Sequence, residues 1–588
     1  MIYEQGQYQQ AGLRYVDGLD ISARGLGMIE KIRTVTGWLL WVPVLLAAGC
    51  NLSSDSDDSN SDTSSTSSDS SSSSTDSSDD VYSGSWNLST GENSTDDIDG
   101  LTFKTINIYL SSSDSLSVES ESTDLVVGTA SDDVTPVTMD GTTVITISEE
   151  SYGITIDSSL DDDTLIEYAL YDEYDQTVTI FSDSDFKLSL NSITINSGDG
   201  PAINIQSDQR AFVELPDDSE NTLTDSTTWT DRYLDGGDEM DLKATLFSEG
   251  PLIFSGDGSL SITAAKKHAI CSDDHVRITE GTFSLTANKK DGIRANDAFI
   301  LDDGDVSIAT SKGKGIKVEG KEDDTAPIGF IAINDGTLNI DSYDKAITAA
   351  WEGDEDGDTE TSDDDPDPRV TINGGTITIT TTETPTDDLS PEGIEAKSVL
   401  TINGGTLNIQ TTDDALNAGT SLIINDGYIY AVASDNDAID SNGTLTINGG
   451  IIVANGAGNA EGGLDCDENT FTITGGTFIG FGGRNSSPTS SVTTQNTVSL
   501  SSITSGLLVI KDSSGNVAFA YTMPESASDV LLSSADLETD TTYTVYKGGS
   551  IGSYSELFHG LYLDPNSYTS GSSTGSSFTI SSTVTTVH

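Results

Sequence analysis

A glycine recurs at short intervals through the second half of the chain, each time between two runs in which apolar and polar residues alternate. Alternation with a period of two on both sides of a glycine turn predicts short β-strands with one buried face. The intervals run from 22 to 39 residues. The recurring glycines are Gly258, Gly281, Gly304, Gly336, Gly375, Gly405, Gly427, Gly450 and Gly476.

This spacing predicts a solenoid of the parallel β-helix type. A coil of about 22 residues accommodates three short strands, and each coil stacks on the one before it. A second small-apolar signal follows most of the glycines, and the residue two places beyond it is small, as an inward-facing stack at a tight corner requires. These residues are Ser272, Ala295, Val318, Ala349, Ala396, Ala418, Ser441 and Cys466. An array of β-sandwiches is the rival architecture, but it would not keep the glycine register.

The repeat divides the chain into regions. Residues 246–484 carry the solenoid rungs, and residues 82–245 are expected to form a β-rich N-terminal part of the solenoid. Residues 485–588 are expected to form a small C-terminal β region, which begins with a hairpin signal at 507–521. Both ends of the solenoid need caps, because an open end exposes a strand edge.

The N-terminal part has the pattern of a lipoprotein signal peptide at residues 28–49. Lys31 and Arg33 precede an apolar run at 38–48, which is too short to span a bilayer and ends at a site with small residues. The sequence LLAAGC, which ends at Cys50, resembles the bacterial lipobox and predicts lipidation of that cysteine. An ordinary secretory peptide with an incidental cysteine is the alternative.

Two further N-terminal segments have no predicted fold. Residues 1–27 are expected to lie upstream of the true start at Met28. Residues 50–81 are expected to be a disordered tether, because positions 51–80 hold 16 Ser and 8 Asp and cannot bury enough apolar surface to order. Asn51 follows the predicted lipidated cysteine, where inner-membrane retention would favour Asp, so we expect an outer-membrane or cell-surface location.

The charge of the chain excludes some partners. With 25 basic and 97 acidic residues, the formal net charge is −72. A nucleic-acid-binding protein needs a basic footprint, and adhesion to anionic lipid through charge needs a polybasic patch, so neither kind of binding fits. So much acid on an exported protein suggests an exterior rich in cations that screen the repulsion.

Four stretches occur in order before or at the start of the rungs: LSLNSITI at 188–195, GPAINI at 200–205, ENTLTD at 220–225 and LFSEGPLIFSGDGSLSI at 246–262. Together they resemble the carbohydrate-binding β-helix lipoproteins, a family first catalogued as a domain of unknown function, over roughly residues 165–480. The resemblance implies a right-handed parallel β-helix similar to pectate lyases, which binds calcium and plant cell-wall polysaccharides such as cellulose and pectin. It assigns no individual ligand residue here.

A basic ladder is the first candidate site. Between residues 266 and 321 the chain has ten bases and nine acids, in contrast to its acidity elsewhere. Basic residues recur there at steps of 23, and we expect them to grip an anionic polysaccharide such as polygalacturonate. The alternative is a solvated edge with balanced charges. The ladder comprises Lys266, Lys289, Lys312, Arg294 and Lys317.

An acidic edge further along the solenoid is the candidate calcium site. Carboxylates on adjacent rungs, about 4.8 Å apart, are hard oxygen ligands that would repel each other without a cation. An unliganded acidic face is the alternative. The expected ligands are Asp414, Asp435, Asp437, Asp440 and Asp465.

A second calcium candidate is the acidic insertion at 354–365. Asp354, Asp356 and Asp358 match positions 1, 3 and 5 of a calcium loop, and Asp365 stands at position 12. The glycine usual at position 6 is Thr359, so the match is partial. An acidic loop that binds no metal is the alternative.

An aromatic pair completes the candidate sites. Tyr428 and Tyr430 are predicted to lie on an outward face near the last rungs, where aromatic rings could stack on sugars. Exposed apolar stripes of this kind are more often covered, and we expect the C-terminal region to pack there.

These features favour a surface-anchored, monomeric, calcium-dependent polysaccharide-binding protein without catalytic activity. A polysaccharide lyase would need a base near the calcium to remove a proton, and no such constellation is evident in the sequence. A calcium-dependent lyase and a structural adhesin remain the alternatives.

Overall fold

The computed structural model describes residues 86–98, 100–111, 116–160, 164–234, 236–320, 329–351, 368–386 and 388–588, all within the unit Asp80–His588. The predicted signal peptide, Cys50, the tether and the insertion at 354–365 lie outside the described residues. The described part of the chain contains 47 strands and no helix, as the all-β prediction requires. None of these residues forms a helix of the length and apolarity needed to cross a membrane.

Antiparallel strands close the N-terminal end. Strand β1 (Phe103–Ser111) pairs antiparallel with β2 (Ser117–Ser120). A meander of four antiparallel strands continues the cap: β3 (Leu125–Val127), β4 (Val134–Met139), β5 (Thr142–Glu150) and β6 (Gly153–Ser158). Strand β6 pairs parallel with the next strand of its sheet, β8, and β1 pairs parallel with β7. From these two pairs onward the solenoid is built of parallel strands.

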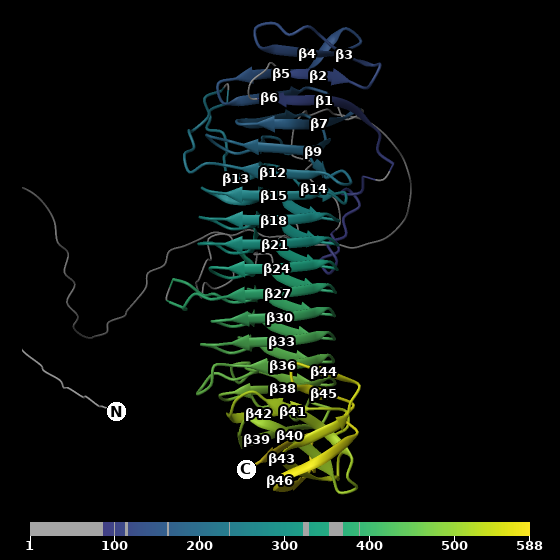
Figure 1. The fold of residues 1–588 in the computed structure, drawn as a ribbon, viewed down its shortest axis with the longest axis vertical. Coiled ribbons are helices and arrows are strands. Elements are labelled where there is room, and N and C mark those ends of the chain that lie inside the picture. Colours follow the sequence, from purple (N-terminus) through teal and green to yellow (C-terminus); the bar gives the residue numbers. More distant parts are fainter. Residues whose placement is uncertain are drawn as a thin grey trace, which may run out of the picture. The chain divides into compact units, whose positions relative to one another are not determined.

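Three columns of parallel strands build the solenoid (Figure 1). Column A starts at β6 and comprises β8 (Thr177–Ser182), β10 (Ile203–Ile205), β13 (Ala244–Ser248), β16 (His268–Ser272), β19 (Ile293–Ala295), β22 (Ile316–Gly320), β25 (Ile347–Trp351), β28 (Ile394–Ala396), β31 (Leu416–Ala418) and β34 (Ile439–Ser441). Column B starts at β1 and comprises β7 (Leu165–Tyr174), the first half of β9 (Phe186–Asn196), β11 (Ala211–Glu214), β14 (Leu252–Ser255), β17 (His275–Ile278), β20 (Ala298–Leu301), β23 (Phe330–Ile333), β26 (Arg369–Ile372), β29 (Val399–Ile402), β32 (Ser421–Ile424), β35 (Thr444–Ile447) and β37 (Phe471–Ile473). Column C takes the second half of β9 and comprises β12 (Glu220–Thr224), β15 (Ser259–Ala264), β18 (Thr282–Ala287), β21 (Asp305–Thr310), β24 (Thr337–Ser342), β27 (Thr376–Thr381), β30 (Thr406–Thr411), β33 (Tyr428–Ala433), β36 (Ile451–Asn455) and β38 (Thr477–Gly482).

The recurring glycines form the corner between columns B and C. Gly336 has a φ of 87°, which a side chain disfavours, and a Cβ there would lie 2.6 Å from the carbonyl oxygen of Gly304. Because each corner rests on the one before it, only glycine fits both the backbone angle and the close approach. The glycine register therefore reflects the stacking of the rungs.

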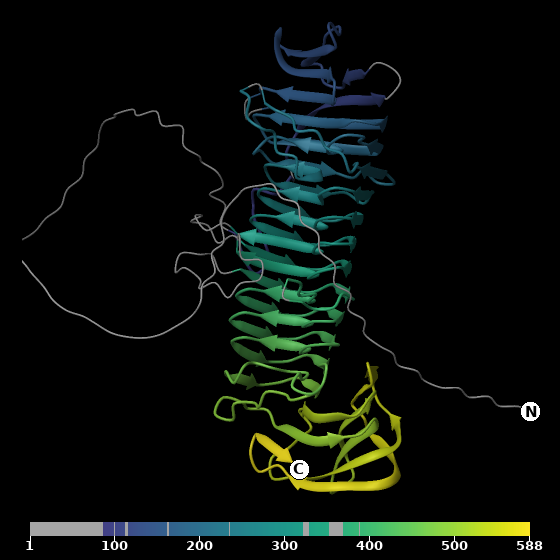
Figure 2. The same ribbon diagram turned by 90° about the vertical axis from the view of Figure 1, so that its left-hand side faces the viewer.

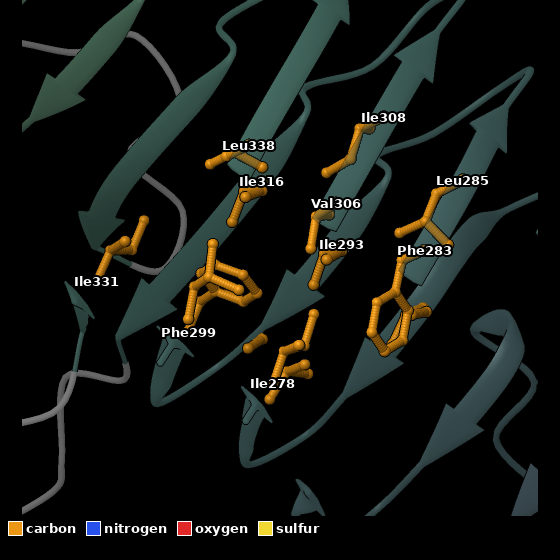
Figure 3. Packing of buried hydrophobic residues seen from close by; sticks show 14 of the residues in the cluster. Ile278, Phe283, Leu285, Ile293, Phe299, Val306, Ile308, Ile316, Ile331 and Leu338 are labelled. Atoms are coloured by element: carbon orange, nitrogen blue, oxygen red, sulfur yellow. The ribbon is translucent and has the colours of Figure 1, made fainter. Parts of the chain in front are cut away.

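Apolar side chains line most of the interior of the solenoid. Figure 3 shows aliphatic and aromatic side chains of neighbouring rungs, among them Phe283, Val306, Ile308 and Leu338, pointing into the same space. The predicted stack of small residues from Ser272 to Cys466 is fully buried, and parallel register joins its members from Ser272 to Ser441. The prediction of a solenoid with this inward stack is confirmed.

A ladder of asparagines lies at the end of column B. Side-chain amides donate to the preceding side chain from Asn373 to Asn334, Asn403 to Asn373, Asn425 to Asn403 and Asn448 to Asn425, at 2.8 to 2.9 Å. Such a ladder satisfies polar groups in each rung and stabilises the stacking.

A segment that we call the strap, residues 86–97, runs alongside column B (Figure 1). Its Trp86 and Leu88 pack on a patch formed by Ala298, Ile300, Phe330 and Ala332. The asparagine ladder contributes as well, since Asn334 and Asn373 donate to the carbonyl oxygens of Thr90 and Ser89, each at 2.7 Å. The strap thus covers an apolar part of column B.

The C-terminal region closes the other end of the solenoid. Strands β39 (Thr497–Ile503), β42 (Ala527–Ser533) and β47 (Val584–Val587) continue from β38, and β42 pairs antiparallel with both β38 and β39. A separate six-stranded antiparallel sheet comprises β40 (Gly506–Asp512), β41 (Val517–Met523), β43 (Thr542–Ser553), β44 (Glu556–Phe558), β45 (Leu561–Leu563) and β46 (Ser567–Thr579). The predicted hairpin at 507–521 is the β40–β41 pair.

Candidate functional site

The outer face of column A carries a line of charged residues in register. Parallel pairing places Arg294 beside Lys317, Lys317 beside Thr348, Glu395 beside Asn417 and Asn417 beside Asp440. Neighbouring strands in a sheet are about 4.8 Å apart, so these side chains stack along the solenoid. The face therefore changes from basic to acidic along its length, as the sequence pattern predicted.

At the basic end, part of the predicted ladder is neutralised. Arg294 and Lys317 each form an ion pair with Glu319, at 2.8 Å, and Lys317 is only 5% exposed. These two residues are therefore not free to grip a polysaccharide, and that part of the expectation needs correction. The sequence did not reveal the pairing because Glu319 lies outside the 23-residue repeat of the bases.

The three lysines of the ladder occupy the corner that follows column C. Register between β15, β18 and β21 brings Lys266, Lys289 and Lys312 onto successive rungs. The Lys266 Nζ lies 5.6 Å from the centre of the Trp229 ring, and the Lys312 Nζ lies 5.7 Å from that of Tyr343. Lys289 and Lys312 are exposed and form no ion pair with another described residue.

A buried ionic network, which the sequence analysis missed, occupies the middle of the face. The Lys345 Nζ lies 3.0 Å from Glu392 and 3.2 Å from Glu395, and Glu395 also pairs with Lys397 at 2.9 Å. Burial opposes ionisation of both carboxylates, but the charges of Lys345 and Lys397 lower the pKa of Glu395 to about 2. Burial and the charge of Glu395 instead raise the pKa of Glu392 to about 8.

At the acidic end, carboxylates from adjacent rungs converge in what we call the acid cluster, Asp414, Asp437, Asp440 and Asp465. Oxygens of Asp437, Asp440 and Asp465 lie within 4.8 Å of one another. Asp414 adjoins them, since the Asp437 backbone N–H donates to its carboxylate at 3.0 Å. Asp435, the fifth predicted ligand, is exposed and does not join the converging oxygens.

The pKa values in the acid cluster are raised. Burial, followed by repulsion from neighbouring carboxylates, raises the pKa of Asp437 to about 8 and that of Asp440 to about 7. The same two causes raise the pKa of Asp414 well above its ordinary value. Without a cation, the cluster therefore resists full ionisation at neutral pH.

A groove of about 750 Å³ adjoins the acid cluster. Asp437 and Asp465 line it together with Glu461, Ser486 and Arg484. Arg484 is exposed and places a cation at the edge of an otherwise acidic surface. Its position comes from the isolated parallel bridge between Glu461 and Arg484, a long-range contact that no local sequence pattern indicated.

The predicted aromatic pair lies beneath the C-terminal region. The Tyr430 ring stacks on His559 with 3.8 Å between ring centres, and the Tyr428 ring meets Phe558 edge-on at 5.4 Å. Tyr428 and Tyr430 therefore do not form an open platform on the solenoid, although Tyr428 stays partly exposed at the edge of the C-terminal region. The C-terminal region packs on this face, as the sequence analysis expected.

Comparisons with known proteins give a family match for the middle of the chain. Residues 158–438 match the family described as carbohydrate-binding domain-containing protein. No curated protein matches the chain. A solved structure of the polysaccharide lyase-like protein from C. thermocellum, as a gadolinium derivative, is 17% identical with a TM-score of 0.32, and the match covers 48% of this chain and 98% of that chain.

Proposed function

Because residues 158–438 match the family described as carbohydrate-binding domain-containing protein, we propose that this protein binds an acidic polysaccharide through calcium held at the acid cluster. The observation that carries the proposal is the convergence of Asp437, Asp440 and Asp465 beside a groove that Arg484 lines. The binding is non-catalytic, and pectin-like plant cell-wall glycans are the expected class of ligand.

The donor set of the acid cluster suits calcium. Calcium prefers six to eight oxygen ligands and tolerates irregular geometry, which carboxylates from different rungs can supply. Zinc favours nitrogen and sulfur ligands, and the converging groups are all carboxylates. A bound cation also removes the repulsion that raises the pKa values of Asp437 and Asp440.

Calcium and Arg484 together favour a glycan that carries carboxylates. A uronate group can complete the coordination of an ion that the protein ligates only in part, and a guanidinium pairs well with a carboxylate. The net charge of −72 repels such a polymer elsewhere on the surface. Docking is therefore directed to the few places where cations lie.

The proposal extends to the hand of the coil, the anchoring of the chain and a second calcium site. The coil is right-handed, because crossover connections between parallel strands almost always take that hand. The chain is anchored by lipid at Cys50 in the bacterial envelope, at the outer membrane or cell surface, and acts as a monomer. The acidic insertion at 354–365 is a second calcium site.

Polygalacturonate binding measured with calcium and with a chelator tests the function. We expect chelation to abolish binding, and the double substitution Asp440→Asn/Asp465→Asn to weaken it roughly tenfold or more, because each change removes a ligand oxygen charge. Asp435→Asn is the matched control, since it removes an exposed carboxylate from the same turn region, and it should bind like the unmodified protein.

Two further arms separate this proposal from its rivals. A Lys266→Ala/Lys289→Ala/Lys312→Ala variant should lose affinity most at low salt, because the attraction of these lysines to an anionic polymer is screened least there. The ultraviolet absorbance of unsaturated products should stay flat, and a calcium-dependent rise would instead identify a lyase. Binding that survives both the chelator and the double substitution would contradict the proposed site.

A further inference from the structure

The C-terminal region forms a second groove with the last rungs, on a different face from the acid cluster. Its volume is about 260 Å³, and it lies where the ends of β33, β36 and β38 meet β44 and β45. Figure 2 shows the β44–β45 part of the C-terminal region, in yellow, beside the end of the solenoid. Tyr428 and Tyr562 supply aromatic surface, and Asp536, Glu556 and Asp564 supply carboxylates.

Contacts on both sides hold the groove in shape. The Tyr428 hydroxyl donates to Glu556 at 3.2 Å, which ties the solenoid to β44. Across the groove, the Tyr562 ring meets Tyr554 edge-on at 5.0 Å, and its hydroxyl lies 3.3 Å from that of Thr522. The aromatic rings are therefore positioned before any ligand enters.

The chemistry of the lining selects one kind of ligand. Carboxylates accept hydrogen bonds from neighbouring hydroxyls, while an aromatic ring packs on an apolar face, so a ligand with both features suits the groove. No lysine or arginine lines it, and its three carboxylates repel an anionic ligand. Among the described residues, only Asp437, Asp440 and Asp465 converge as metal ligands, so the carboxylates here are spread apart.

We propose that this groove binds an uncharged pyranose unit of a neutral glycan without calcium. Sugar rings combine vicinal hydroxyls with an apolar face of C–H groups, which matches the carboxylates and the tyrosine rings. The volume is below the roughly 300–1,000 Å³ of sites for drug-sized ligands, and it suits one or two sugar rings. The site is built largely by residues after 438, beyond the family match, and goes beyond the acidic-polysaccharide function.

Saturation-transfer NMR and titration with neutral tetrasaccharides test this inference on the whole protein. The probes are cellotetraose, xylotetraose and mannotetraose, each with a chelator present. We expect at least one to bind saturably, Tyr562→Ala to weaken that binding about tenfold, and Tyr562→Phe to retain most of it. Tyr568→Ala is the matched control, because Tyr568 packs on Tyr546 and does not line the groove.

Several results would overturn the inference. Failure of all three neutral probes to bind would do so, as would unchanged binding by Tyr562→Ala when its melting curve matches that of the unmodified protein. Tighter binding of deacetylated chitotetraose than of every neutral probe would identify a cation site instead. The double substitution Asp440→Asn/Asp465→Asn should leave neutral-sugar binding intact. Loss of polygalacturonate binding would therefore not affect the neutral-sugar test, and the two proposals can fail separately.

Discussion

Replacing Asp96 by alanine is expected to destabilise the protein by about 3–5 kcal/mol, the usual cost of removing one partner from a buried ionic network. Asp96 belongs to the strap, and its side chain is 2% exposed. It lies 3.2 Å from His275 Nε2 and 3.4 Å from the Arg277 guanidinium, with Arg210 at 3.9 Å. The substitution removes the one carboxylate that these three groups share. His275 then keeps only the ion pair with Asp274, while Arg277 and Arg210 keep those with Asp302 and Asp185, which are more exposed than Asp96.

The same network predicts a dependence on pH. Burial alone would lower the pKa of His275, but hydrogen bonds and the charges of Asp274 and Asp96 outweigh it and raise that pKa to about 9. A histidine with a raised native pKa stabilises fully below its unfolded pKa of about 6.5, and this contribution is lost as the pH rises towards 9. We therefore expect the strap to loosen between neutral pH and pH 9, and Asp96→Ala to reduce this dependence.

Hydrogen exchange of the strap amides and chemical unfolding measure both effects. Glu92→Ala is the matched control, because it removes an exposed carboxylate from the same strap and should change neither measurement. Slow strap exchange in Asp96→Ala at pH 7, with unfolding like that of the unmodified protein, would show that the ionic network does not hold the strap.

The solenoid could be predicted because its determinants are local and repeated. Gly304 and Gly336 mark corners where the backbone angle and the close approach of the previous rung both demand glycine. Alternating residues on either side then decide which side chains face inward, and the small residues from Ser272 to Cys466 follow from that register. Because the same pattern repeats in each rung, it was sufficient to predict how the rungs stack.

Contacts between distant segments could not be predicted in the same way. Asp96 is one of 97 acidic residues in the sequence, and nothing near it indicates a partner 179 positions away at His275. The Lys345 network depends on Glu392, which enters after an insertion that breaks the repeat length. Lys317 followed the basic period, yet its charge is neutralised by Glu319, which that period does not include.

The candidate site shows the same division. Asp437 and Asp440 lie on one rung and Asp465 on the next. They were predicted to converge because adjacent rungs bring such carboxylates within reach, and their oxygens do converge. Asp435 was grouped with them by spacing, but it lies on the exposed side of its turn. Arg484 joins the groove after the last complete rung, where the repeat no longer constrains position.

Calcium is expected to stabilise the protein much more at pH 8 than at pH 5. The raised pKa values of Asp437 and Asp440, about 8 and about 7, mean that the native state holds protons that the unfolded chain has lost. Stability without calcium should therefore fall as the pH rises from about 4 towards 8. For Asp440 alone the fall is on the order of 4 kcal/mol, at about 1.4 kcal/mol per pH unit.

Bound calcium replaces those protons, so the stability of the protein no longer decreases as the pH rises. Melting curves should be measured at pH 5 and pH 8, each with calcium and with a chelator. We expect the melting temperature with calcium to exceed that with the chelator by several degrees at pH 8, and this gap to be absent at pH 5. Titration with calcium at pH 7 should also release protons, because the ion binds the ionised carboxylates. Asp440→Asn should narrow the gap, whereas Asp435→Asn should leave it unchanged, because the Asp435 carboxylate does not join the converging oxygens. A gap of equal size at both pH values would mean that calcium acts elsewhere than at the acid cluster.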